Sequence, residues 1–127
     1  RRDKKVCLKG GDLLMRNHRL YVKDIFQAME SIEKFVEGME FEDFKRDDKT
    51  LSAVIRKFEI IGEATKNLPD TIKEKYTIVP WKEMAGMRDK LIHFYFGIKH
   101  DLVWRTIKDV VPQVKPLMRK ILEEFEK

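Results

Sequence analysis

The residues that could do chemistry in this chain are gathered in one short segment, Met87 to Gly97. This segment carries a guanidinium at Arg88, an imidazole at His93 and a phenol at Tyr95 among bulky apolar residues. An imidazole titrates near pH ~6.5 and can move a proton near neutral pH. A guanidinium can hold an anionic group through a planar pair of hydrogen bonds. The segment therefore predicts a site for proton transfer beside a bound anion.

The spacing of these residues limits how they can cooperate. Arg88 and His93 are five positions apart, which on a helix separates them by roughly 140° around the axis. They can flank a groove, especially if a second copy of the helix lies opposite. Asp89 lies four positions before His93 and shares its face, so its carboxylate could orient the imidazole. The same residues could equally be a solvated Arg88 and Asp89 with His93 and Tyr95 half-buried and satisfied.

Other site patterns are missing from the sequence. There is no Gly-rich phosphate loop, no Cys/His cluster at metal spacing and no Gly-x-Ser-x-Gly turn, so no metal or cofactor is expected. His18, His93 and His100 are too scattered to suggest a zinc site. Cys7 is the single cysteine, so a disulfide within the chain is excluded.

The elements that must position the segment read as helices throughout. Apolar residues at helical spacing predict long helices from Tyr21 to Val36, Lys49 to Leu68, Trp81 to Tyr95 and Asp101 to Phe125, with a short helix over Thr71–Tyr76. Glu40 to Lys49 reads as a connection. The pattern predicts an all-α fold, an antiparallel bundle of four long helices plus a short one.

Start and stop residues refine these helices. Asp47 or Asp48, Asp70 and Asp101 are expected to cap helix starts. Gly38 and Pro69 are expected to end helices, and Gly86 to mark a break inside the fourth region. Pro112 and Pro116 are expected to kink the last helix.

Length and charge describe one small domain. The 127 residues contain 43% hydrophobic residues, enough for one core. Residues 1–14 read as a basic leader and residues 15–127 as the domain. The net charge of +5 belongs to residues 1–19, and residues 20–127 are neutral overall, so bulk capture of nucleic acid is not indicated. The longest stretch free of Lys, Arg, Asp and Glu is Leu91 to Ile98, which is too short to span a membrane, and we expect a cytoplasmic protein.

The order Arg88, four residues, His93, then Tyr95 matches the R-x4-H-x-Y motif, and the chain resembles HepT-like toxins of the HEPN superfamily. The resemblance covers about Met15 to Leu122 and depends on motifs that occur in order along the chain, at residues 19–21, 24–25, 60–64, 78–81, 85–88, 91–97 and 102–104. The basic leader departs from it.

This resemblance implies a specific function. HepT-like proteins are all-helical homodimers whose motif helices form one composite cleft. They act as metal-independent endoribonucleases and as toxins paired with a minimal nucleotidyltransferase antitoxin. By this resemblance Arg88 and His93 are catalytic, Asp89 supports them, and Tyr95 accepts AMP from the antitoxin. Two other functions stay open: a non-catalytic nucleotide-binding module that only accepts AMP, and a purely structural dimerisation domain whose interface includes residues 94–96.

Overall fold

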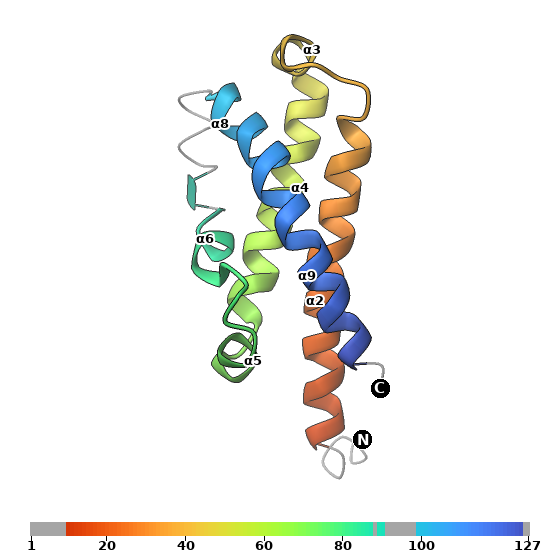
Figure 1. Cartoon of the computed structure of the whole chain (residues 1–127), viewed down its shortest axis with the longest axis vertical. Helices are drawn as coiled ribbons and strands as arrows, with labels where there is room; N and C mark the ends of the chain where they lie inside the picture. The colour runs from red at the N-terminus through yellow and green to blue at the C-terminus, as the bar shows by residue number, and fades with distance from the viewer. Residues whose placement is uncertain (1–9, 88, 91–98, 126–127) are drawn as a thin grey trace, which may run out of the picture.

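Two long helices form the centre of the structure. The computed structural model describes residues 10–87, 89–90 and 99–125, with side chains described from residue 17 onward. Helices α2 (Gly10–Phe35) and α4 (Asp48–Asn67) run antiparallel, and α9 (Val111–Phe125) lies across them (Figure 1). Every regular element in this described part is helical. The fold is all-α, as the sequence predicted.

The core is built from one apolar stripe on each long helix. Apolar residues recur every three or four positions on these helices, which places them on one face. Their side chains are almost completely buried: Ile25, Met29 and Ile32 on α2, Val54, Phe58 and Ile61 on α4, and Val114, Met118 and Ile121 on α9. Because burying one such side chain contributes about 1.5–3 kcal/mol, these stripes hold the bundle together.

Helix α2 starts earlier than the sequence predicted, while its C-terminal end lies within one residue of the predicted one. The helix begins at Gly10, five residues before Met15, so part of the expected leader is helical. At the other end, Gly38 adopts a φ of +78°, which a residue with a side chain rarely accepts. The predicted stop at Gly38 is confirmed, while the domain boundary at residue 15 stays a prediction.

A short helix replaces the connection expected between α2 and α4. Helix α3 (Phe41–Arg46) occupies it and buries Phe44, whose ring centroid lies 5.1 Å from that of Trp104. The connection expected over Glu40 to Lys49 is thus mostly helical in the structure, and Phe44 anchors it against an aromatic partner far away in the sequence. Asp47 then caps α4, since its carboxylate accepts hydrogen bonds from the Thr50 backbone at 3.0 Å and hydroxyl at 2.8 Å.

Helices α5 (Asp70–Lys75) and α6 (Trp81–Ala85) are short. The expected cap at Asp70 was wrong: Pro69 precedes the helix and Asp70 is its first residue. Pro69 holds the extended backbone of the position before the helix, with φ −75° and ψ 160°. The break at Gly86 is confirmed, since α6 ends at Ala85 and helical geometry resumes at Met87. The remainder of the predicted fourth helix, residues 91–95, lies outside the described residues.

The last helical run contains a wide turn. It consists of α8 (His100–Arg105), a π-helical turn η1 (Thr106–Val110) and α9. The expected cap at Asp101 was wrong, because Lys99 precedes the helix and Asp101 pairs with Arg105 at 3.5 Å. Kinks were expected at Pro112 and Pro116; the structure has the wide turn just before Pro112, and Pro116 lies inside helix α9. Pro112 has no N–H to donate to the preceding turn, and instead the Val111 N–H donates to the Thr106 carbonyl five residues back.

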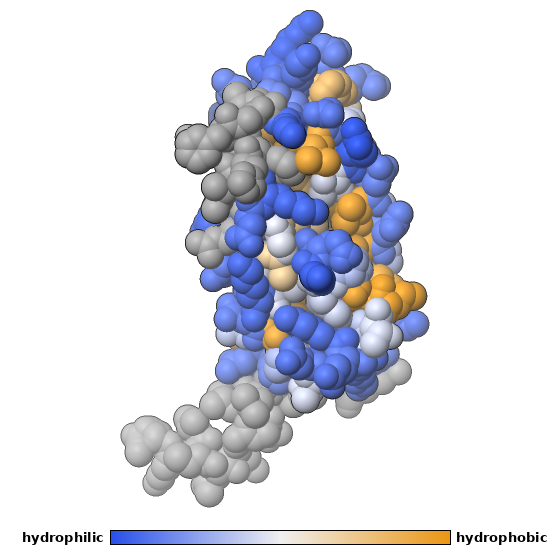
Figure 2. Space-filling view, turned by 90° about the vertical axis from the view of Figure 1, so that its left-hand side faces the viewer, coloured by the Kyte–Doolittle hydropathy of each residue, from blue (hydrophilic) through white to orange (hydrophobic). Residues whose placement is uncertain are grey.

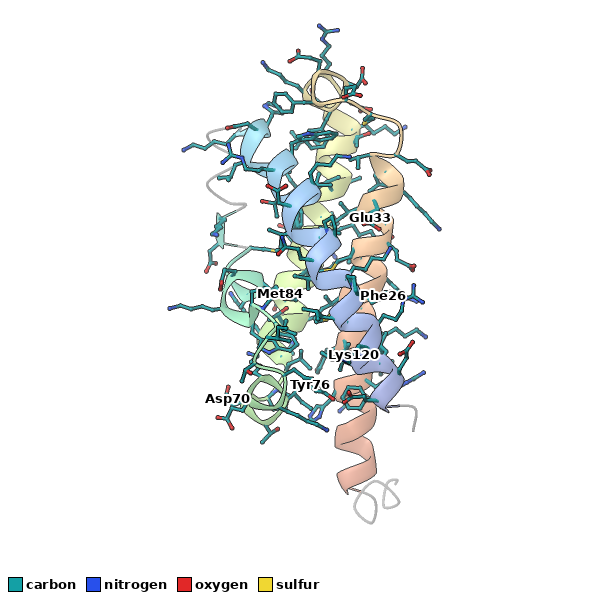
Figure 3. All side chains as sticks on the ribbon, in the orientation of Figure 1. Phe26, Glu33, Asp70, Tyr76, Met84 and Lys120 are labelled. Atoms are coloured by element: carbon teal, nitrogen blue, oxygen red, sulfur yellow. The ribbon has the colours of Figure 1, made fainter. Side chains whose placement is uncertain are left out.

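Side chains tie α9 to its neighbours at two levels (Figure 3). On α2, Glu33 pairs with Lys115 at 2.6 Å, and the ring of Phe26 lies beneath Lys115 and Arg119. Near the end of α9, Glu124 accepts a hydrogen bond from the Tyr76 hydroxyl. Burial and this hydrogen bond raise the pKa of Tyr76 to about 12.

One face of the described part is mostly hydrophilic. Figure 2 shows the face that lies on the left of Figure 1, where apolar side chains form only small groups among polar ones. The large apolar side chains exposed in the described part are Leu20, Phe35 and Ile78. None of the described helices combines the length and apolar character needed to cross a membrane.

The Asp47 cap predicts how stability depends on pH. The Thr50 hydrogen bonds lower the pKa of Asp47 in the folded chain. Its stabilising contribution is therefore complete above the ordinary pKa of an aspartate and disappears as the pH falls through the lowered pKa of the folded state. Between about pH 5 and about pH 2, the melting temperature of the wild type should fall more than that of Asp47→Ala, as measured by circular dichroism. Asp48→Ala is the matched control and should keep the wild-type pH dependence. An Asp47→Ala curve parallel to the wild type would show that the cap contributes nothing.

Candidate functional site

Of the four predicted site residues, the structure describes Asp89. Arg88, His93 and Tyr95 lie outside the described residues, so their placement and roles stay predictions. Asp89 is helical, its side chain is 73% exposed, and its Oδ1 lies 3.9 Å from Nζ of Lys66 on α4. An exposed ion pair at this distance contributes little to stability. It does show that the start of the motif lies beside the C-terminal part of α4.

Helix α6 leads directly into the motif and is firmly anchored. Met84 and Trp81 are buried against the core, and Figure 3 shows Met84 on the side of α6 that faces it. The Trp81 indole N–H donates to the Tyr76 carbonyl at 3.0 Å. After the break at Gly86, the Lys90 N–H donates to the Gly86 carbonyl at 3.0 Å, so the helix restarts at once. The chain therefore enters the motif in a fixed position.

An apolar cavity borders the start of the motif. Its volume is about 290 Å³, and it lies between α4, α6 and the α8–η1 run. Its apolar walls are Phe58, Met87, Leu102, Val103 and Val110.

Three polar side chains complete the lining of this cavity: Glu83, Lys90 and Thr106. The Thr106 hydroxyl donates to the Leu102 carbonyl at 2.8 Å, which leaves its oxygen able to accept a hydrogen bond. The cavity thus offers an anionic acceptor, a cationic donor and a neutral acceptor at an otherwise apolar site. Periodicity could not reveal it, since its residues come from four separate segments.

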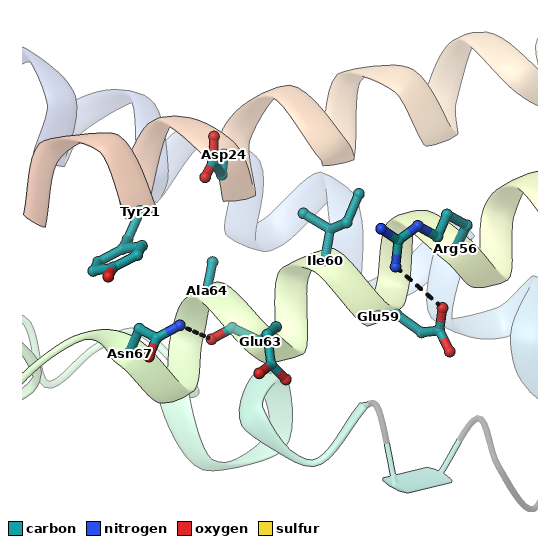
Figure 4. A pocket seen from close by; sticks show the side chains of 8 residues that line it. All are labelled: Tyr21, Asp24, Arg56, Glu59, Ile60, Glu63, Ala64 and Asn67. Atoms are coloured by element: carbon teal, nitrogen blue, oxygen red, sulfur yellow. Dashed lines mark hydrogen bonds and ion pairs between the residues drawn. The ribbon is translucent and has the colours of Figure 1, made fainter. Parts of the chain in front are cut away.

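A second, more polar groove lies between side chains of α2 and α4 on the surface. It has a volume of about 320 Å³, and Figure 4 shows Tyr21 and Asn67 toward one end and Arg56 toward the other. Arg56 pairs with Glu59 at 3.6 Å, and the Asn67 amide donates to the Glu63 carbonyl at 3.1 Å.

The charges of this groove are mainly negative. Asp24, Glu59 and Glu63 line it together with a single cation, Arg56. Carboxylates at this density repel phosphate groups. The groove is therefore poorly suited to holding a nucleic-acid backbone, although Tyr21, Asp24, Glu63 and Ala64 belong to the motifs that carry the family resemblance.

No metal centre is found within residues 10–87, 89–90 and 99–125, where no three His, Cys, Asp or Glu side chains come together in a way that could hold an ion. His18 and His100 are far apart in the sequence and on different helices, α2 and α8. Cys7 lies outside the described residues.

Comparisons with known proteins agree with the sequence pattern. The family model described as Ribonuclease HepT-like matches residues 25–121. A protein named probable ribonuclease HepT from Thermococcus cleftensis is 48% identical over 108 residues, which cover 85% of this chain and 98% of the relative. A protein named as a candidate RNase from Caldanaerobacter subterraneus subsp. tengcongensis is 46% identical over 110 residues, or 87% of this chain and 98% of the relative.

One relative carries a second function in the same chain. It is a Methanocaldococcus jannaschii protein named both as a gamma-glutamylcyclotransferase and as a candidate RNase, and it is 41% identical over 114 residues, or 90% of this chain and 51% of the relative. No solved structure matches the chain. The family model covers most of the sequence and the relatives align over nearly all of the domain, so the chain belongs to the ribonuclease HepT-like family of the HEPN superfamily.

Proposed function

We propose that this protein is the toxin of a HEPN/minimal nucleotidyltransferase toxin–antitoxin module and cleaves RNA without a metal ion, at a composite site of a cytoplasmic homodimer. The observation that carries the proposal is membership of a ribonuclease family together with Arg88 and His93 at the R-x4-H spacing. Asp89 is a positioning residue, and Tyr95 is the point of regulation.

The two proposed catalytic groups account for a complete cleavage step. His93 takes the proton of a ribose 2′-hydroxyl, and the oxygen attacks the adjacent phosphorus. The bond from phosphorus to the 5′-oxygen breaks, this oxygen receives the proton back from the His93 imidazolium, and a 2′,3′-cyclic phosphate remains. Arg88 binds the non-bridging oxygens and stabilises the charge that develops on them. A second copy of the chain, related by a twofold axis, would supply a second Arg88 and a second His93 on the far side of the cleft.

The case for a dimer rests on the apolar residues of the motif segment. Met84 and Met87 are buried within the single chain, so they need no partner. The remaining large apolar residues are Leu91, Ile92, Phe94, Tyr95 and Phe96, crowded into six consecutive positions. One short helix has only one face toward its own bundle, so part of this set favours contact with a second copy.

The catalytic proposal is tested with purified protein and single-stranded RNA in chelator. Wild type should cleave the RNA, and His93→Ala and Arg88→Ala should each lower the rate by about 10²–10⁴-fold while melting as the wild type does. His100→Ala and Arg46→Ala are matched controls, because they remove the same chemical groups outside the motif. Activity that disappears in chelator and returns with a divalent metal would contradict the mechanism. AMP acceptance without any RNA cleavage would favour the non-catalytic binding module.

The assembly is tested by light scattering at micromolar concentration. The mass should be about twice the 15.2 kDa of one chain. Phe94→Glu should shift the mass toward one chain, because it places a charge in the proposed interface. Phe35→Glu is the control, since Phe35 is already 38% exposed on α2. A monomeric wild type would rule out the composite site.

Tyr95 is proposed to switch the enzyme off. Its phenol oxygen attacks the α-phosphorus of ATP, pyrophosphate leaves, and the phenol proton passes to a carboxylate of the antitoxin or to solvent. A phenol has an ordinary pKa near ~10, so the nucleotidyltransferase must supply this base and its metal. The attached AMP would bring a negative phosphodiester to the place where the RNA phosphate binds, beside Arg88 and His93.

Mass spectrometry checks this switch after incubation with ATP and the cognate nucleotidyltransferase. One added AMP should appear on the peptide that contains Tyr95, with complete loss of cleavage. Tyr95→Phe should remain active and unmodified. The other two tyrosines serve as internal controls, since Tyr21 lines the α2–α4 groove and Tyr76 is hydrogen bonded to Glu124. Silencing of Tyr95→Phe to the same extent would refute the role of Tyr95.

A further inference from the structure

The apolar cavity between α4, α6 and the α8–η1 run has no part in the mechanism described above. The π turn lines one side of it through Thr106 and Val110, which lie four positions apart. A π turn places an extra residue in a helical turn, and such turns are frequent at functional sites. The cavity therefore lies at an irregular point of the last helical run.

The position of the cavity connects it to the motif. Met87 and Lys90 both line it, and they lie one position before and two positions after Arg88 in the sequence. The cavity is therefore lined by the sequence neighbours of a proposed phosphate-binding residue.

The chemistry of the lining selects what can enter. Most of the wall is apolar, so a phosphate would lose its hydration there without compensation. Glu83 can accept hydrogen bonds, Lys90 can donate them, and the Thr106 oxygen can accept one more. A nucleobase has two apolar ring faces and an edge with both donors and acceptors, which matches this combination. A volume of about 290 Å³ is at the lower end of the range found for small-molecule pockets.

We propose that this cavity binds one unpaired nucleobase of the RNA substrate and so determines which linkage is presented to Arg88 and His93. This inference rests on the proposed ribonuclease function. Single-stranded RNA suits such a pocket because its bases can turn out of the stack. Phe58, Met87 and Val110 contact the ring faces, while Glu83, Lys90 and Thr106 select among base edges.

Binding is measured first, with an uncleavable 2′-O-methyl oligonucleotide and with the same backbone lacking its bases. Wild type should bind the oligonucleotide with bases about 5- to 150-fold more tightly, the range expected for one held base. Val110→Phe fills the cavity and should abolish this preference without weakening the binding of the abasic backbone. Ile78→Phe, at a position 76% exposed, is the control of equal chemistry and should keep the preference. Equal binding of both oligonucleotides by wild type would overturn the proposal.

A second variant guards against misfolding of Val110→Phe. Glu83→Gln changes an exposed acceptor at the cavity, and it should alter the relative affinities for oligonucleotides of the four single bases. Glu74→Gln, an exposed glutamate on α5, should not. If Glu83→Gln leaves the order of affinities unchanged, or if Val110→Phe only weakens association between copies of the chain, the cavity is not a base pocket.

Cleavage of the corresponding RNA separates this proposal from the ribonuclease function. Val110→Phe should cleave base-containing RNA more slowly than the wild type does. Its rate should approach the rate at which the wild type cleaves RNA that lacks the base at the bound nucleotide. Base-dependent binding without cleavage would contradict the proposed ribonuclease function and support the base pocket. Cleavage without base-dependent binding would contradict the base pocket and support the ribonuclease function.

Discussion

Burial of the apolar stripes of α2 and α4 against each other sets the position of the other elements, because α9 attaches to α2 and α6 attaches to α4. Most of a helix's stability in a protein comes from packing of its apolar face, so each of these two helices depends on the other. The segments that surround the candidate site add few buried side chains of their own: Phe44 for α3, Ile72 for α5, and Trp81 and Met84 for α6. Helix α3 packs against α4 and α8, and helix α6 packs against α4. The buried side chains of the long helices therefore supply most of the core on which these short helices rest.

Much of the bundle could be predicted from the sequence because the long helices have a strong apolar period. The predicted second helix, Lys49 to Leu68, differs from α4 by one residue at each end. The errors have local causes. α3 was missed because the value of burying Phe44 depends on Trp104, and the caps at Asp70 and Asp101 were misplaced because Pro69 and Lys99 take the positions before these helices. A periodic pattern reports which face is buried, but it does not report which partner lies opposite.

The candidate site was also predictable from the sequence only in part. The motif could be recognised from sequence because residue types and spacing define it. Its surroundings could not: the pairing of Lys66 with Asp89 joins two helices, and the cavity combines Phe58, Met87, Leu102 and Val110 from across the chain. The π turn that lines part of this cavity was indicated only indirectly, through the prolines expected to disturb the last helix. Family membership supports a ribonuclease activity, while the structure shows which described side chains lie around the start of the motif.

The hydrogen bond between Tyr76 and Glu124 has a mechanical consequence. Tyr76 also receives the indole N–H of Trp81 on its carbonyl, and Trp81 begins the helix that leads into the motif. The last turn of α9 is thus two side-chain contacts away from α6, although Glu124 and Tyr76 are 48 positions apart in the sequence. With a pKa of about 12, Tyr76 keeps its proton throughout the physiological range, so this brace holds regardless of cellular pH. Shortening the chain at α9 would remove Glu124, and with it the side-chain link that connects the end of α9 through Tyr76 to Trp81.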